Sequence, residues 1–425
     1  MTISWGIRSM VATGATISVL LAPAAARAAA GATTVLVDVA ADGTPGNGAN
    51  TDWDIADNGR VVAFVSDSGN LVAGDTNATH DAFVRDLNAG TTTLVSGGRN
   101  GQPANGPVRD VAISGNGRYV AFTSDASNLV AGDTNGQRDV FVHDRRTGVT
   151  VRAGAGTGLQ QSPSISDDGR YVTFIQADIP NGVRPQVYVR DLTAGVTRQV
   201  SVPFPDSEAA AFSAEISGDG AWVAFAATGD YVGDGGSASA VYLTSRATGG
   251  AIRVSPQTSD TAPFVDASAP SIDRAGSKVL YVSNARLDPS DSNGMDDLYL
   301  YDVAARTTTL VTANAARTGA GDSGTSGGAL SADGRFAGFG SNASDLVRRD
   351  TNGFVSDAFL RNLGAGGTTL VSTDVSGAGA NGPSYRAVPS ADASRVLFAS
   401  EATDLGPDPG DSRPHLYLRS TPFHR

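Results

Sequence analysis

The chain repeats one unit seven times, and this repetition constrains its fold more than any other feature of the sequence. The unit is clearest in Ser114–Phe122, SGNGRYVAF, which is followed by Asp139–Asp144, DVFVHD. An aromatic residue stands five positions after the turn residue in every copy. The turn residues recur every 51 to 59 residues and are Gly59, Gly117, Gly169, Gly220, Gly276, Gly334 and Ala393. Such a period is typical of architectures in which each unit packs against its neighbours.

Each copy contains four short runs of strand-forming residues. The first run ends in an aliphatic residue such as Ile113, and the next two are Tyr119–Ser124 and Val140–Val142 in the second copy. The fourth run is β-branched, as in Thr92–Ser96, TTLVS. Runs rich in Val, Ile, Thr, Phe and Tyr and bounded by Gly, Asp and Asn predict β-strands. Four antiparallel strands in each repeat predict the blades of a β-propeller.

The two ends of the repeat array complement each other. The last copy supplies its third strand at Leu416–Arg419 and has no fourth strand before Arg425, whereas an isolated fourth-strand segment, Thr33–Asp38, precedes the first copy. We therefore predict an all-β chain with a single seven-bladed β-propeller over residues 33–421, built from four-stranded antiparallel blades. The N-terminal strand is expected to close the last blade, which leaves no exposed edge for aggregation.

The first residues predict a secretory signal peptide. Arg8 supplies the positive charge, Met10–Leu21 is a short apolar stretch, and Ala26-Arg27-Ala28 is a small-x-small cleavage site. We expect a signal peptide over residues 1–28, with cleavage possible up to residue 30, and a secreted or periplasmic protein. The apolar stretch is too short to span a bilayer permanently, so no membrane span is expected after cleavage.

Charge and composition exclude several classes of function. The chain has 31 Lys and Arg against 43 Asp and Glu, a net charge of −12, which disfavours a nucleic-acid binder. It has no Cys, which excludes thiol catalysis and Cys-ligated zinc. Its four His show no metal-ligand spacing, so a transition-metal centre is not expected.

The predicted loops differ in length on the two faces of the ring. The turns between first and second strands are tight, as in Ser166–Arg170, and so are those between third and fourth strands, as in Asp144–Gly148. The connections from second to third strand and from fourth strand to the next blade are long, and they emerge on the same face. Long loops on a rigid scaffold often carry function, so we expect a ligand there, although tolerated insertions would give the same pattern.

The long loop before the third strand carries a recurring D-x-N-x-x-x-D pattern. It comprises Asp75, Asn77 and Asp81 in the first copy, Asp133, Asn135 and Asp139 in the second, and Asp291, Asn293 and Asp297 in the fifth. The sixth copy, Asp350–Asp357, has an extra residue, and the other copies lack the set. Oxygen ligands at positions 1, 3 and 7 resemble a hard-cation loop and predict a possible Ca²⁺ site. The alternative is that these side chains form Asx-turns that fix the entry into the third strand.

Two further patterns bear on catalysis. Asp54 and Glu215 precede the aliphatic residue of the first strand in their copies and could form a carboxylate pair across the channel, as a glycosidase requires, or simply line a wet channel. Gly324–Gly328 matches G-x-S-x-G around Ser326, but we expect it in a Gly-rich loop, where the strand-to-helix elbow of a hydrolase is missing.

The repeat itself resembles a known family. Ser114–Phe122 and Ser166–Phe174, continuing through Asn128–Asn135 to Asp139–Val142, are similar to the TolB-like, WD-repeat-related propeller repeat of exported bacterial proteins. The resemblance covers residues 33–420 and implies a propeller. TolB itself resembles a six-bladed propeller with an additional N-terminal domain, whereas this chain has seven copies and no such domain.

Two functions follow as hypotheses. The first is an exported, non-catalytic, monomeric binding scaffold that presents its long-loop face to a protein or an envelope glycan. The alternative is a propeller enzyme, a lyase or a lactonase- or glycosidase-like hydrolase, acting at the channel mouth with or without a bound cation.

Overall fold

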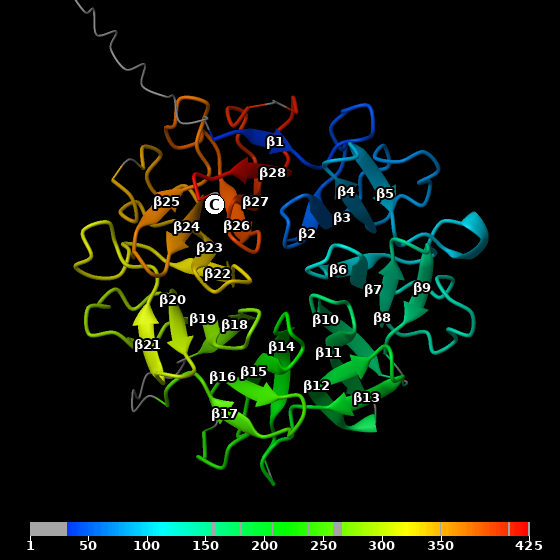
Figure 1. The fold of residues 1–425 in the computed structure, drawn as a ribbon, viewed down its shortest axis with the longest axis horizontal. Coiled ribbons are helices and arrows are strands. Elements are labelled where there is room, and N and C mark those ends of the chain that lie inside the picture. The colour runs from blue at the N-terminus through cyan, green and yellow to red at the C-terminus, as the bar shows by residue number, and fades with distance from the viewer. Residues whose placement is uncertain are drawn as a thin grey trace, which may run out of the picture.

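Twenty-eight strands form seven four-stranded antiparallel sheets arranged as a ring in the described part of the chain (Figure 1). The computed structural model describes residues 32–423 except 155, 157, 179–180, 206, 237, 258–265, 349 and 407–408. The predicted signal peptide lies outside the described residues. Helical structure in the described residues is confined to short 3-10 segments such as η1 (Arg99–Gly101), and none of it could span a bilayer. The predicted all-β, seven-bladed propeller is confirmed.

Each blade contributes one strand to each of four concentric positions, and blades are numbered 1 to 7 from β2 onward. The inner strands are β2 (Asn50–Ile55), β6 (Val108–Ile113), β10 (Leu159–Ile165), β14 (Ala210–Ile216), β18 (Ala267–Ile272), β22 (Thr325–Leu330) and β26 (Ser384–Pro389). The second strands are β3 (Val61–Ser66), β7 (Tyr119–Ser124), β11 (Tyr171–Asp178), β15 (Trp222–Thr228), β19 (Lys278–Ser283), β23 (Phe336–Ser341) and β27 (Arg395–Ser400). The third strands are β4 (Asp81–Asp86), β8 (Asp139–Asp144), β12 (Val183–Asp191), β16 (Ala240–Ser245), β20 (Asp297–Asp302), β24 (Asp357–Asn362) and β28 (His415–Ser420). The outer strands are β5 (Thr91–Leu94), β9 (Val149–Arg152), β13 (Val196–Gln199), β17 (Ala251–Arg253), β21 (Thr307–Leu310), β25 (Thr368–Leu370) and β1 (Thr34–Leu36).

The hydrophobic core lies between successive blades. All six residues of β3 are buried, because the second strand of a blade is covered on both faces. The repeated aromatic residue stands opposite an aromatic residue of the third strand; in blade 1, Phe64 pairs with Phe83 and their ring centres lie 5.7 Å apart. One apolar cluster joins Val84 of blade 1 to Phe122 of blade 2. A blade therefore completes its core only when its neighbours are in place.

The N-terminal strand closes the ring, as predicted. Strand β1 pairs antiparallel with β28, with Val35 opposite Leu418 (Figure 1). Directly after β1, the fully buried Asp38 accepts hydrogen bonds from the Leu416 amide (3.0 Å) and the Asn50 side chain (2.7 Å). Its carboxylate also contacts Nδ1 of the fully buried His415 (2.8 Å), whose Nε2 faces Asp411 (3.0 Å). The closing blade is thus held by a buried ion pair as well as by strand pairing.

The charge state of His415 follows from these two carboxylates. Burial alone would lower the pKa of His415, but the hydrogen bonds and charges of Asp38 and Asp411 outweigh it and raise that pKa above its ordinary value. The folded environment therefore favours the imidazolium form of His415 more strongly than water does.

We predict that Asp38→Ala lowers the free energy of unfolding by about 3–5 kcal/mol, because it leaves His415 as a buried charge with one partner removed. Asp42→Ala, at an exposed position a few residues away, serves as the control and should change stability little. Urea unfolding of both variants measures the difference. Equal stability of the two variants would show that the buried pair does not hold the closure.

We also predict that the contribution of His415 falls as pH rises. Because its folded pKa is raised, the stabilisation is complete below the unfolded pKa of about 6.5 and is lost as pH rises through the folded value. His415→Gln should therefore cost more stability at about pH 5.5 than at about pH 9. Unfolding curves of the parent and the variant at both pH values test this, and a constant or growing difference with pH would contradict it.

Candidate functional site

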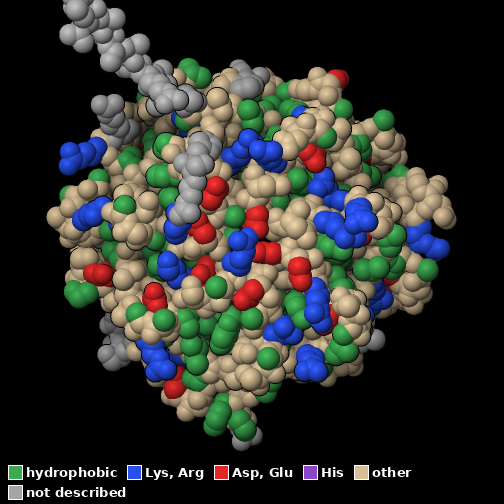
Figure 2. Space-filling view, viewed as in Figure 1, with side chains coloured by type: hydrophobic (Ala, Val, Ile, Leu, Met, Phe, Trp, Pro, Cys, Tyr) green, Lys and Arg blue, Asp and Glu red, His purple; other side chains and the backbone are tan. Residues whose placement is uncertain are grey.

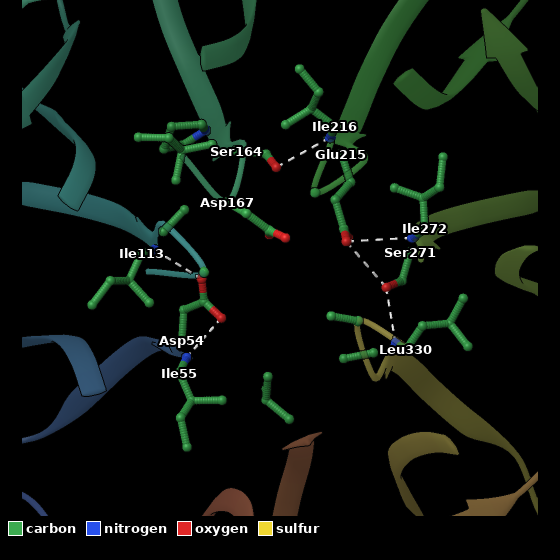
Figure 3. Close-up of a pocket in the computed structure, with 18 of the residues that line it drawn as sticks. Asp54, Ile55, Ile113, Ser164, Asp167, Glu215, Ile216, Ser271, Ile272 and Leu330 are labelled. Atoms are coloured by element: carbon green, nitrogen blue, oxygen red, sulfur yellow. Dashed lines mark hydrogen bonds between the residues drawn. The ribbon is translucent and has the colours of Figure 1, made fainter. Parts of the chain in front are cut away.

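The inner strands surround a central channel that contains a cavity of about 350 Å³. Asp54 of β2 and Glu215 of β14 both line it, together with Ser164, Asp167 and Ser271 (Figure 3). The two carboxylates that the sequence singled out therefore do lie in one cavity. Hydroxyl and carboxylate groups among Ile, Leu and Val side chains make the lining polar and acidic.

The polar channel residues hold neighbouring blades together. An inner strand has one unpaired edge, so its backbone N–H groups need acceptors from outside its own sheet. In four blades, the side chain before the strand's aliphatic residue accepts the N–H of the aliphatic residue in the next blade (Figure 3). These pairs are Asp54 with Ile113 (2.9 Å), Ser164 with Ile216 (3.2 Å), Glu215 with Ile272 (3.4 Å) and Ser271 with Leu330 (3.0 Å).

This structural role was missed at the sequence level, since it depends on contacts between blades. It could have been suspected from the position, which is filled by Asp, Ser or Glu in four copies, by Ala in two and by Val388 in the last. Asp54 and Glu215 were expected to form a carboxylate pair or to line a wet channel. In either case, one carboxylate oxygen of each residue is already hydrogen-bonded to the backbone of the next blade.

Burial makes both channel acids titrate near neutrality. Burial raises the pKa of Asp54 to about 6, against the effect of its backbone hydrogen bonds. Burial, with a smaller effect from the charge of Asp54, raises the pKa of Glu215 to about 7. Arg386 of β26 forms an ion pair with Asp52 in the same cavity, and its positive charge lowers the pKa of both Asp54 and Glu215 to a smaller extent. Carboxyl groups with such pKa values are suited to general acid–base chemistry.

The tight turns between inner and second strands meet at one end of the channel. The second residue of each of these turns accepts a backbone N–H from the preceding turn, so that seven N–H···O=C bonds of 2.9–3.1 Å run around the ring without a break. The acceptors are the carbonyls of Asp57, Gly115, Asp167, Gly218, Arg274, Ala332 and Ala391.

An ion triad spans this end of the channel. Arg274 of blade 5 donates to both Asp57 of blade 1 and Asp167 of blade 3. Gly218, the turn residue beside Asp167, has no room for a side chain, because a Cβ at this position would lie 2.5 Å from a carboxylate oxygen of Asp167. Figure 2 shows acidic and basic side chains gathered around the middle of the disc. The tight-turn end is therefore tied together by both backbone bonds and ion pairs.

The nine residues predicted to bind a metal lie in three loops on separate blades. In the first two of these loops the Asn Oδ1 accepts the backbone N–H two residues on, at 3.2 Å from Thr79 to Asn77 and at 3.0 Å from Gln137 to Asn135. Asn293 accepts from Met295 in the same way (2.8 Å). These contacts support the Asx-turn alternative. Within the described residues no three acidic or His side chains are grouped to hold a metal, so the calcium site remains a prediction.

The long-loop face carries exposed apolar side chains. Among the described residues, five large apolar side chains are exposed outside the strands, and all five lie in the long connections: Val202, Phe204, Met295, Phe354 and Val375. A second cavity, of about 570 Å³, lies on this face between blades 5 and 6 and is lined in part by Met295, Asn342 and Ser326. Ser326 was expected in a loop, but it belongs to strand β22, at a register shift between Thr325 and Gly328 where β22 pairs with β23. No nucleophile elbow is formed there.

Comparisons with known proteins identify the fold alone. No family model and no curated protein matches the chain. The oligogalacturonate lyase of Vibrio parahaemolyticus aligns with a TM-score of 0.55 and 12% identity over 91% of this chain and 97% of that one. The β-propeller domain of the Trilobed protease from Pyrococcus furiosus aligns with a TM-score of 0.54 and 10% identity over 87% and 95%. TolB from Acinetobacter baumannii aligns more weakly, with a TM-score of 0.41 and 14% identity over 80% and 76%. The chain is a β-propeller, and its resemblance to TolB rests on the repeat residues.

We predict that Glu215→Gln gains stability relative to the parent as the pH rises from acidic to neutral. A raised folded pKa means that the stability linked to Glu215 is present below its unfolded pKa and is lost as pH rises through about 7. The parent should lose on the order of 2 kcal/mol relative to the variant between about pH 4.5 and pH 8, after allowance for solvent in the channel. Unfolding measured across this range tests it, with the exposed Glu208→Gln as the control. Parallel pH profiles for parent and Glu215→Gln would contradict the assignment.

Proposed function

We propose that this protein is an exported, non-catalytic binding scaffold that uses its long-loop face to hold a protein or an envelope glycan. The observation that carries the proposal is the placement of Val202, Phe204, Met295, Phe354 and Val375, which are exposed on that face in the described loops. Apolar side chains scattered singly need no explanation, but outside the strands the exposed ones in the described residues all lie in the long connections and none in the tight turns, which favours an interaction surface.

The opposite end of the ring offers less for a ligand. The seven-bond ring of turns and the ion triad of Arg274, Asp57 and Asp167 tie it together. Export rests on the signal-peptide pattern of the first residues and on the resemblance of the repeat to that of exported proteins. A long-loop face built on a rigid ring is a common arrangement for recognition.

The alternative, an enzyme acting at the channel mouth, is favoured by the pKa values of Asp54 and Glu215 in one cavity. Against it, each acid has an oxygen bonded to the backbone of the next blade. The oligogalacturonate lyase shares only 12% identity with this chain, so its activity is not transferred. The scaffold therefore remains the function that the geometry supports best.

We predict that Phe354→Ser combined with Met295→Ser weakens partner capture at least roughly tenfold, because exposed apolar anchors often carry most of the binding energy. The matched control is Val149→Ser combined with Val151→Ser, which alters two exposed Val of the outer strand β9. Each full-length variant is immobilised and exposed to native envelope extract and to a glycan array. The parent and the control should retain the same ligands.

Two results would refute the scaffold. One is equal capture by the loop variant and the control. The other is a lyase or hydrolase activity of the parent on a panel of uronic-acid polymers, glycosides and lactones that Glu215→Gln or Asp54→Asn abolishes while the fold is kept.

A further inference from the structure

Buried oxygens without a hydrogen-bond partner are concentrated in the D-x-N-x-x-x-D loops. Seven such atoms belong to this pattern: the Oδ2 atoms of Asp81, Asp133, Asp139, Asp297, Asp350 and Asp357, and Oδ1 of Asn352. The side chains of Asp81, Asp297 and Asp357 are fully buried. A buried carboxylate oxygen that has lost water and gained no partner is costly, so its recurrence at one repeat position needs a physical reason.

Blade 2 shows one way of compensating these carboxylates. Arg152, the last residue of β9, forms ion pairs with Asp133 (3.5 Å) and Asp139 (3.1 Å) at the first and last positions of the loop pattern. It stands opposite Phe141 in the strand register. The guanidinium therefore lies where the two acids of the loop converge.

Blade 4 repeats this solution at the same register position. Arg253 stands opposite Tyr242 and forms an ion pair with Asp234 of its loop (2.8 Å). Strand-end arginines at this position thus serve the acidic loop in two blades whose loop sequences differ.

Blades 1, 5 and 6 carry leucine at this position. Leu94 stands opposite Phe83, Leu310 opposite Tyr299 and Leu370 opposite Phe359. Among the described residues, no ion pair reaches the loop acids of these blades, which are Asp75 and Asp81, Asp291 and Asp297, and Asp350 and Asp357. Within the part of the chain that the structure describes, each of these blades therefore has two neighbouring loop acids that lack an ion-pair partner.

Local hydrogen bonds do not remove the imbalance. Thr312 donates to Oδ1 of Asp297 (2.5 Å), and Ser96 donates to Oδ1 of Asp81 (2.6 Å), which leaves Oδ2 of each acid unsatisfied. The Asx-turns of Asn77 and Asn293 explain the shape of the loops, and both side chains also hydrogen-bond to the last acid of their loop. Oδ2 of Asp81 and of Asp297 is nevertheless left without a partner. An Asx-turn and a bound cation are therefore compatible in the same loop.

We propose that blades 1, 5 and 6 each bind one Ca²⁺ between the two aspartates of the loop, at the place where blade 2 holds the guanidinium of Arg152. The ligands are the carboxylates of Asp75 and Asp81, Asp291 and Asp297, and Asp350 and Asp357, and backbone carbonyls and water complete the six to eight oxygens that calcium requires. The ion fastens each long loop to the start of its third strand. The proposal does not depend on the identity of any ligand of the long-loop face.

The test is a count of bound Ca²⁺ in the full-length protein. The protein is stripped with chelator, dialysed against Ca²⁺ alone, and assayed by atomic emission and by thermal unfolding with and without the metal. The parent should hold three Ca²⁺ and melt at a higher temperature with Ca²⁺ than after chelation. Leu310→Arg should supply the guanidinium to blade 5 and lower the count to two, and Arg152→Leu should open blade 2 and raise it to four.

A matched control separates charge from a general effect of the substitution. Gln199→Arg adds an arginine at the same register position in blade 3, opposite Tyr188, where the loop pattern is missing, and should leave the count at three. Asp291→Asn is a second blade 5 variant, for use if Leu310→Arg fails to fold. Its side chain keeps the shape of aspartate but loses the charge, so it should also lower the count of bound Ca²⁺ by one. No bound Ca²⁺ in the parent at about 1 mM, or a count that neither blade 5 variant changes, would overturn the proposal.

Discussion

The unpaired inner edge of each blade is the constraint on which the ring depends. Seven short strands face a polar channel, and in four of them the N–H of the last aliphatic residue finds its acceptor in the preceding blade instead of in a neighbouring strand of the same sheet. Asp54 and Glu215 belong to this set of acceptors, so their carboxylate oxygens help to join neighbouring blades, whatever chemistry the two residues perform. The same demand explains the ring of turn carbonyls at the tight-turn end, where each blade again bonds to the next.

A second demand arises at the start of the third strand, where several blades bury an ionisable group. Blade 2 balances Asp139 with Arg152, and blade 7 reverses the charges, with His415 at the strand start and Asp38 on the closing strand. The carboxylates of blades 1, 5 and 6 lack such a partner among the described residues, and a cation would balance them. One repeat position thus accepts different sources of positive charge without a change of backbone.

The architecture could be predicted from the sequence because its signals are local and repeated. The turn residue, the aromatic residue five positions later and the isolated segment at Thr33–Asp38 are each visible in one short window. The hydrogen bonds between blades in the channel could not be predicted in the same way, because Asp54 meets Ile113 only after two blades have packed. The equivalence of Arg152 and Leu310 could be predicted from the sequence only in part. An alignment of the copies places them together, but only the ion pairs to Asp133 and Asp139 show what the position does.

The seal between β1 and β28 has a consequence for the order of folding. Because β1 is synthesised before the other strands and its partner β28 after them, six blades can assemble while the outer edge of the seventh is still unpaired. During synthesis, both complementary edges are therefore available to other chains. A neighbouring molecule in the same state could accept the leading strand, so crowding during biogenesis would favour strand-exchanged oligomers over closed rings.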